Sequence, residues 1–395
     1  MPSKSLSEIS VRIFSGGTPS TQCEDYWDGD IPWLSSGETS NRYITKTNAF
    51  ITASGVENSS TRLAKKNSFV IASAGQGLTR GQTSLLCIDT YINQSLIVIE
   101  IDPELANPLY VFFNISTRYE ELRSISDGTS SRGSLTTKLI GELQIDLPDR
   151  KIQDKIASFI SSIDYKINTN QSINDNLLAT AKTLFKNSLD EDSISSVIIS
   201  DICSSVTDGV HNTVEDDPEG SALLLSCKNI KDGQLTIGPN ERTISRKTFE
   251  KLRKRTKLAI GDILLTSVGT IGETYLILDE PDNIEFQRSV ALIKPDPDKV
   301  SPEYLYLAIN HVKESIINAA HGAVQQCLFI NDIGSIEVPL IGKESIERLT
   351  NSVRPLFAQI SQNRKESQHL ANIRDYLLPK LMSGEIDVST LEIPN

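Results

Sequence analysis

The sequence lacks the cysteine and histidine patterns that support disulfide scaffolds, zinc sites or nucleophilic catalysis. Its five cysteines are scattered without Cys-x-x-Cys spacing, and its four histidines are dispersed. We therefore expect small buried thiols in a reducing cytoplasm and no metal site. Motifs of the G-x-x-x-x-G-K-[ST], H-E-x-x-H and G-x-S-x-G types are also missing, so the sequence predicts no catalytic residues.

Long apolar runs and an excess of basic residues are missing as well. No stretch approaches the roughly 18 apolar residues of a membrane span, and MPSKSLSEIS at the N-terminus has no signal-like apolar core. Lys plus Arg number 39 and Asp plus Glu 51, a formal net charge of −12 that argues against a generic polycation. Local basic patches can still bind nucleic acid.

What the sequence does contain is a long internal repeat. Ser95 and Ser289 precede similar apolar runs and are 194 residues apart, and Tyr110 and Tyr304 have the same separation. An offset that stays nearly constant over such a length indicates one duplicated unit with small loop insertions. With 395 residues, the chain is long enough for two or three domains.

Each copy begins with short apolar runs separated by Gly, Ser, Asn and Asp. Strands are predicted at 68–73, 95–101, 262–267 and 290–294. One helix is predicted near 109–115, and its counterpart at 304–310. The globular parts are therefore expected to have an α+β fold.

Each copy ends in a long segment with helical periodicity. Apolar positions recur every three to four residues from Ile156 to Leu184, and again from Leu349 to Leu381. Five such heptads are typical of a coiled coil, and about forty residues make a rod of roughly 60 Å. Both seams turn polar at the same place, which predicts that three residues fix the register of the helix pair: Asn170, Asn174 and Asn363.

The predicted order is globule, helix, globule, helix, with pseudo-twofold symmetry and the two helices paired antiparallel between the globules. Two amphipathic helices buried in ordinary globules are the alternative, which leaves the helix lengths and their matched polar breaks unexplained. The predicted boundaries are 1–149 and 199–342 for the globular domains, 150–189 for the first long helix, 190–198 for a linker, and 343–384 for the second long helix with a tail to 395.

Both copies carry polar, glycine-containing loops at equivalent places, with different residues in each copy. Arg, Lys, Gln and Asn can bond base edges, whereas Ser, Thr and backbone N–H groups suit phosphates. Ordinary surface loops are the alternative, but similar scaffolds with different loops fit the reading of two DNA half-sites. The candidate DNA-binding residues are Ser36, Gln76, Thr79, Arg80, Ser131, Arg132, His211, Asn212, Lys228, Asn229, Thr270, Arg288, Gln325 and Gln326.

The segment 244–261 reverses the charge of the chain locally, because seven basic residues there face one acid, Glu250. This pattern predicts a stripe that follows phosphates, and a solvated helix face is the alternative. The candidate phosphate contacts are Arg246, Lys247, Lys251, Arg253, Lys254 and Arg255.

The segment GGTPSTQCEDYWDGDIPWLSSGE (16–38) resembles the start of a target-recognition domain in specificity (S) subunits of Type I restriction-modification systems. DGVHNT (208–213), LPDRKIQDKIA (147–157) and LLPKLMSGEI (377–386) fall where that family has related segments. The resemblance implies two target-recognition domains separated by an antiparallel coiled-coil pair. It also implies a non-catalytic subunit that reads a bipartite site in double-stranded DNA.

The resemblance further implies partners: two methyltransferase subunits and the restriction/translocase subunits of the full complex. S-adenosylmethionine, ATP and Mg would belong to those partners, with no cofactor in this chain. Asp149 and VPLIGKESIERL (338–349) depart from the family pattern at the helix starts. Two alternatives are a self-contained restriction-modification enzyme, which the missing motifs disfavour, and a non-DNA scaffold protein with duplicated binding domains on a coiled-coil spacer.

Overall fold

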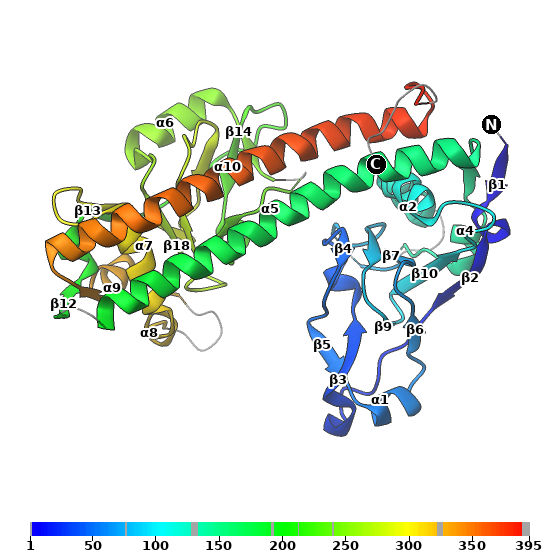
Figure 1. The fold of residues 1–395 in the computed structure, drawn as a ribbon, viewed down its shortest axis with the longest axis horizontal. Helices are drawn as coiled ribbons and strands as arrows, with labels where there is room; N and C mark the ends of the chain where they lie inside the picture. The colour runs from blue at the N-terminus through cyan, green and yellow to red at the C-terminus, as the bar shows by residue number, and fades with distance from the viewer. Residues whose placement is uncertain are drawn as a thin grey trace. The chain divides into compact units, whose positions relative to one another are not determined.

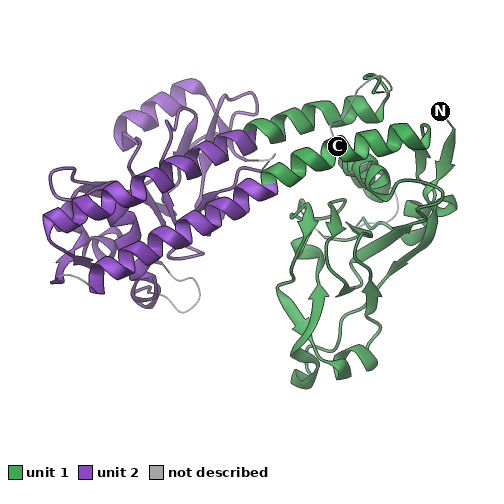
Figure 2. Ribbon diagram, viewed as in Figure 1, with its two compact units in different colours: residues 1–167, 369–395 green, residues 168–368 purple. Residues whose placement is uncertain are grey.

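The structure is a computed structural model that describes residues 2–75, 77–127, 133–190, 193–211, 213–238, 241–321 and 327–388. The chain divides into two compact units, residues 1–167 with 369–395 and residues 168–368 (Figure 2). Two long helices, α5 (Arg150–Asp190) and α10 (Lys343–Met382), contribute to both units. Within the described ranges, no helix combines the length and apolar character needed to cross a membrane.

The first unit is built on a five-stranded sheet in the order β2-β10-β7-β8-β4 (Figure 1). Its strands are β2 (Ser10–Ser15), β4 (Tyr43–Ile44), β7 (Phe69–Ala72), β8 (Thr83–Leu86) and β10 (Leu96–Ile101). A second sheet, β5-β3-β9-β6, contains β3 (Trp27–Leu34), β5 (Ala49–Ile51), β6 (Arg62–Ala64) and β9 (Thr90–Ile92). β1 (Ser3–Ser5) pairs with β11 (Gln144–Asp146). The short helices are α1 (Ala53–Glu57), α2 (Pro108–Ser116), α3 (Tyr119–Asp127) and α4 (Thr137–Gly141).

The second unit repeats this plan on a sheet in the order β13-β21-β18-β19. Its strands are β13 (Cys203–Asp208), β18 (Ile263–Thr266), β19 (Thr274–Leu276) and β21 (Val290–Pro295). Smaller sheets contain β14 (Ala222–Leu225), β17 (Thr243–Ile244) and β20 (Ile284–Phe286), and the pair β15 (Ile230–Lys231) and β16 (Gln234–Leu235). The short helices are α6 (Arg246–Thr256), α7 (Pro302–His311), α8 (Lys313–Asn318) and α9 (Ile330–Gly334).

The predicted duplication is confirmed in detail, because equivalent residues make the same contacts in both copies. The Tyr110 hydroxyl donates to the carbonyl of Asp146 at 2.9 Å, and the Tyr304 hydroxyl donates to the carbonyl of Pro339 at 3.0 Å. The predicted α+β class and the predicted strands and helices are present in both copies. The segment expected as a linker, 190–198, contains a strand, β12 (Ser195–Ile198), which pairs with β22 (Glu337–Leu340).

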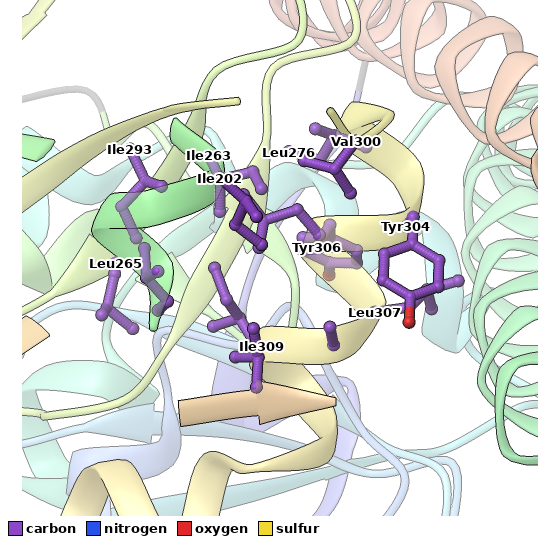
Figure 3. Packing of buried hydrophobic residues seen from close by; sticks show 14 of the residues in the cluster. Ile202, Ile263, Leu265, Leu276, Ile293, Val300, Tyr304, Tyr306, Leu307 and Ile309 are labelled. Atoms are coloured by element: carbon purple, nitrogen blue, oxygen red, sulfur yellow. The ribbon is translucent and has the colours of Figure 1, made fainter. Parts of the chain in front are cut away.

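The core of the second unit shows how α7 is placed on its sheet. Figure 3 shows Tyr304, Tyr306 and Ile309 of α7 among apolar side chains of the unit that include Ile263 and Ile293. Pro302 occupies the first turn of α7, and Ser301 caps it by accepting a hydrogen bond from the Tyr304 amide. Burial of each large side chain stabilises the fold by about 1.5–3 kcal/mol. These contacts hold α7 in place on its sheet.

Within each unit, a segment of α5 runs alongside a segment of α10 in the opposite direction. In the second unit, Asn170 donates to Glu366 at 2.8 Å and to Ser367 at 3.2 Å, and Asn363 donates to Asn174 at 2.8 Å. The seam is therefore polar where the sequence predicted. The long helices span Arg150–Asp190 and Lys343–Met382, beside the expected 150–189 and 343–384.

Candidate nucleic-acid interface

A cavity of about 440 Å³ lies in the second unit, at the ends of β13 and β18. The turn between β20 and β21 and the start of α9 complete its lining. Two predicted DNA-binding residues, His211 and Arg288, line this cavity together with Gln287, Ser267 and Phe329. The fold therefore brings together side chains from four separate parts of the sequence.

Hydrogen bonds hold the backbone of this cavity in place. The Arg288 amide donates to the carbonyl of Val210 at 3.1 Å, and the Gln287 amide donates to the carbonyl of Leu225 at 2.8 Å. The Arg288 side chain itself is exposed. His211 Nε2 lies against the Asp208 carboxylate, and Arg255 lies 3.7 Å from the same carboxylate. Fixed backbone with exposed donors is an arrangement suited to base edges.

Lys228, Asn229 and Thr270 differ in their exposure. Lys228 and Thr270 are exposed, as a DNA contact requires. Burial alone would raise the pKa of Glu241, but hydrogen bonds from Lys228 and Asn229 lower it below its ordinary value. Asn229 is 2% exposed, and its side chain donates to the carbonyl of Thr236 at 2.9 Å and accepts from the Ser226 amide. The prediction for Asn229 is therefore corrected, because its amide is buried and stabilises a turn.

The predicted phosphate stripe lies on α6, and most of its residues are exposed. Lys247, Lys251 and Lys254 are spaced to lie along one exposed face, with Arg255 beside them and Arg246 bonded to Glu250 at 3.2 Å. Such a face can follow a phosphate backbone.

Arg253 is the exception in the stripe. Its guanidinium donates to the buried Glu285 at 2.5 Å and to the carbonyls of Pro281 and Ile284 at 2.7 Å. Burial raises the pKa of Glu285 even though Arg253 bonds to it. The predicted phosphate contact is corrected, since Arg253 joins α6 to β20.

In the first unit, the loop between β7 and β8 is hydrogen-bonded to α3. The Tyr119 hydroxyl donates to the carbonyl of Leu78 at 2.9 Å, and Arg123 donates to the carbonyl of Gly77 at 2.5 Å. Arg80 is only 7% exposed and pairs with Asp127. The predicted base contact of Arg80 is therefore corrected to a structural ion pair, whereas Thr79 keeps a partly exposed side chain.

The remaining predicted residues are placed as follows. Ser36 is partly exposed at the start of a short turn, Ser36–Glu38, and its carbonyl accepts from the Thr39 hydroxyl at 2.7 Å. Six candidates lie outside the described residues: Gln76, Ser131, Arg132, Asn212, Gln325 and Gln326.

Sequence reasoning missed Gln287 and Phe329, which line the same cavity as His211 and Arg288. Gln287 stands directly before Arg288, so the repeat alignment could have found it. Phe329 follows the buried Leu328 and gave no polar signal. Its 62% exposure is evident only in the folded chain.

Comparison with known proteins gives the family context for this geometry. Residues 3–179 match the family described as "Type I restriction modification DNA specificity domain". The chain is 26% identical to the Type I restriction enzyme MjaIX specificity subunit of Methanocaldococcus jannaschii, over 96% of this chain and 92% of that protein. It is 26% identical to the EcoBI specificity subunit of Escherichia coli over 45% of this chain and 38% of that protein.

A solved structure shares the fold. The crystal structure of the Type-I restriction-modification system S subunit from M. genitalium covers 96% of this chain and 95% of its own, with a TM-score of 0.54 and 15% identity. This likeness extends over nearly the whole chain and concerns the fold.

Proposed function

We propose that this chain, a specificity subunit of the type I restriction-modification kind, reads a bipartite sequence in double-stranded DNA with one half-site for each globular copy. One observation carries the proposal: the same scaffold occurs twice and presents different residues at equivalent positions. Gln94, which bonds to Thr18 in the first unit, is the counterpart of the exposed Arg288 in the second. Two readers with different side chains recognise two different half-sites.

The long helices α5 and α10 are proposed to set the spacing between the half-sites. Each base pair added to the spacer moves the second half-site by about 3.4 Å and turns it by about 35°. A stiff helix pair therefore tolerates one spacing, and the polar seam at Asn170, Asn174 and Asn363 would keep the helices in register.

The chain is proposed to act without catalysis of its own, in the cytoplasm. Two methyltransferase subunits would bind it for DNA modification, and restriction/translocase subunits would join that core for cleavage. S-adenosylmethionine, ATP and Mg would be bound by those partners. The two relatives are specificity subunits of restriction enzymes, which supports this division of labour.

Methylation mapping tests the proposal. The chain is expressed with its methyltransferase subunit in a host without methylation, and single-molecule sequencing locates the modified bases. We expect a split motif with a fixed gap. Full methylation by the partner alone, or a folded complex that modifies no split motif, contradicts the proposal and favours a scaffold that does not bind DNA.

Insertion of one heptad into both long helices tests the spacing role. Seven residues lengthen a helix by roughly 10.5 Å, which corresponds to about three base pairs. The mapped motif should keep both half-sites and gain about three base pairs between them. An unchanged gap would mean that the helices do not set it.

A further inference from the structure

Phe329 is an exposed aromatic residue in a position that its own helix does not favour. Its side chain is 62% exposed, and it stands at the N-cap of α9. Ser, Thr, Asn and Asp are preferred at N-caps because their side chains accept a hydrogen bond from the first turn. A phenyl ring cannot accept that bond, so the choice of Phe is not explained by helix formation.

The equivalent N-cap position in the first copy has no aromatic ring. Thr136 caps α4 there, and its hydroxyl accepts from the Leu139 amide at 3.2 Å. In α9, the remaining cap interaction runs the other way: the Phe329 amide donates to the Asp332 carboxylate at 3.0 Å. The second copy thus gives up a side-chain cap for an apolar ring facing solvent.

The backbone that presents this position is fixed identically in both copies. The Leu328 amide donates to the carbonyl of Ser267 at 2.8 Å, and the Leu135 amide donates to the carbonyl of Ser73 at 2.9 Å. Both leucines are 4% exposed, so each anchors the residue that follows it. The residue after the anchor is displayed outward by the scaffold itself.

The ring of Phe329 is also supported from one side. The His321 ring stacks on it with centroids 6.2 Å apart and planes inclined by 28°. Backbone hydrogen bonds in both directions between His321 and Cys327, at 2.8 and 2.9 Å, hold that support. The His321 ring therefore lies against one side of Phe329, and Phe329 is 62% exposed.

The surroundings of the ring are both polar and apolar, since Asp208, Val268 and Ile330 line the same cavity. Phe329 lines the cavity that also contains His211, Gln287 and Arg288. An apolar ring beside hydrogen-bond donors matches the major-groove edge of a base pair that contains thymine, where an acceptor lies next to a methyl group.

We propose that Phe329 reads a thymine of the second half-site by contact with its 5-methyl group. His211, Gln287 and Arg288 bond neighbouring base edges. This inference rests on the proposed function and names a specificity residue within it. The exposed N-cap position, Thr136 in one copy and Phe329 in the other, is then a reading position of the shared scaffold.

The Phe329→Thr variant separates recognition from folding, because it places the first copy's residue at the equivalent position. A Thr cap should stabilise the start of α9 and raise the thermal midpoint slightly. Binding of the full methyltransferase complex to its mapped site should weaken roughly tenfold. Ile317→Thr, which replaces a 40% exposed apolar residue on α8 of the same unit, is the matched control and should leave the affinity unchanged.

Deoxyuridine, which lacks the 5-methyl group, identifies the base. Replacing the thymines of the second half-site one at a time should lower wild-type affinity by about fourfold at one position. The Phe329→Thr complex should show no further loss at that position. Loss at every thymine, or none, overturns the thymine assignment.

The failure of this inference is distinguishable from failure of the proposed function. If the wild-type complex modifies no split motif, both the proposed function and the role of Phe329 are contradicted. A wild-type complex with a split motif, combined with unchanged affinity in Phe329→Thr, overturns only the role of Phe329. A lower thermal midpoint in Phe329→Thr, with affinity lost in proportion to unfolding, assigns the ring a packing role instead.

Discussion

In each unit the globular part packs against the long helices. Charged residues make this junction in the first unit, and apolar residues make it in the second. Asp164 of α5 and Arg374 of α10 are the charged pair at this junction in the first unit. Shifting by 193 residues, from 164 to 357 and from 374 to 181, gives their counterparts in the second unit, Phe357 and Ala181. The duplicated backbone is thus compatible with both a buried ion cluster and an apolar contact.

In the first unit, Asp164 is 3% exposed and accepts three hydrogen bonds. Arg42 donates to it at 3.1 Å, Tyr43 at 2.5 Å and Arg374 at 2.7 Å. Burial, and then the negative charge of Asp164, raises the pKa of the Tyr43 hydroxyl above its ordinary value. This junction depends on every member being present.

In the second unit, Phe357 is 3% exposed and Ala181 is fully buried. Phe357 packs edge-on against Tyr306 of α7, with ring centroids 5.7 Å apart. Apolar contacts are non-directional and tolerate changes of shape, whereas an ion cluster that loses one member leaves a buried charge. Substitutions should therefore destabilise the ionic junction of the first unit strongly and the apolar junction of the second unit only weakly.

The largest expected effect is that of Asp164→Asn. The amide keeps the size of the side chain but leaves Arg42 and Arg374 without a buried counter-charge, which should destabilise the first unit by about 3 kcal/mol. Hydrogen exchange measured by mass spectrometry should show lost protection in β4 and α2, with the second unit unchanged. Asp375→Asn, at a 64% exposed partner of the same Arg374, is the control and should cost less than about 1 kcal/mol.

Asn363→Ala tests the polar seam in the second unit. Removing this donor leaves the Asn174 side chain without its 2.8 Å partner in a buried seam, at a cost of about 2 kcal/mol. Chemical denaturation followed by exchange protection of the second unit measures the loss. Asn168→Ala, at an exposed position of α5, should be neutral or slightly stabilising. Equal losses in both variants would mean that the seam adds nothing beyond helix propensity.

Phe357→Leu sharpens the contrast with Asp164→Asn, because both are conservative changes at equivalent positions. The apolar junction should lose only about 1 kcal/mol, since neighbouring side chains can repack around Leu. The same exchange experiment compares the two units directly. A loss of about 3 kcal/mol or more in the free energy of unfolding would show that the apolar junction is as sensitive to substitution as the ionic one.

The sequence predicted the fold well because duplication doubles each signal. The strands near 68–73 and 262–267 were found in both copies, and the helical periodicity of α5 and α10 extends over about five heptads, apart from the polar seam positions. The charged junction was not predicted. Asp164 and Arg374 are 210 residues apart, and their pairing is visible only when α5 and α10 lie side by side.

The candidate site was predicted less completely, because residue type does not reveal burial. Arg80 and Arg253 have the side chains of DNA contacts, yet Arg80 is itself buried and pairs with Asp127, and Arg253 pairs with the buried Glu285. Phe329 shows the reverse case, since an apolar residue next to a buried Leu328 reads as core. Local sequence gives the chemistry of a loop, and the tertiary contacts decide which side chains remain available.

The smallest expected effect on stability is that of Lys251→Ala on α6. The first unit has the short helix Ala53–Glu57, without Lys or Arg, where the second has α6, so we expect the second half-site to carry more of the phosphate contacts. Stability should change by less than about 0.5 kcal/mol because Lys251 is exposed. The slope of log affinity against log salt should fall by about one for a lost phosphate contact, with no change in the mapped motif. Lys65→Ala, at an exposed lysine of the first unit, is the control. An equal change of slope in both variants would show that the two units share the electrostatic contact evenly.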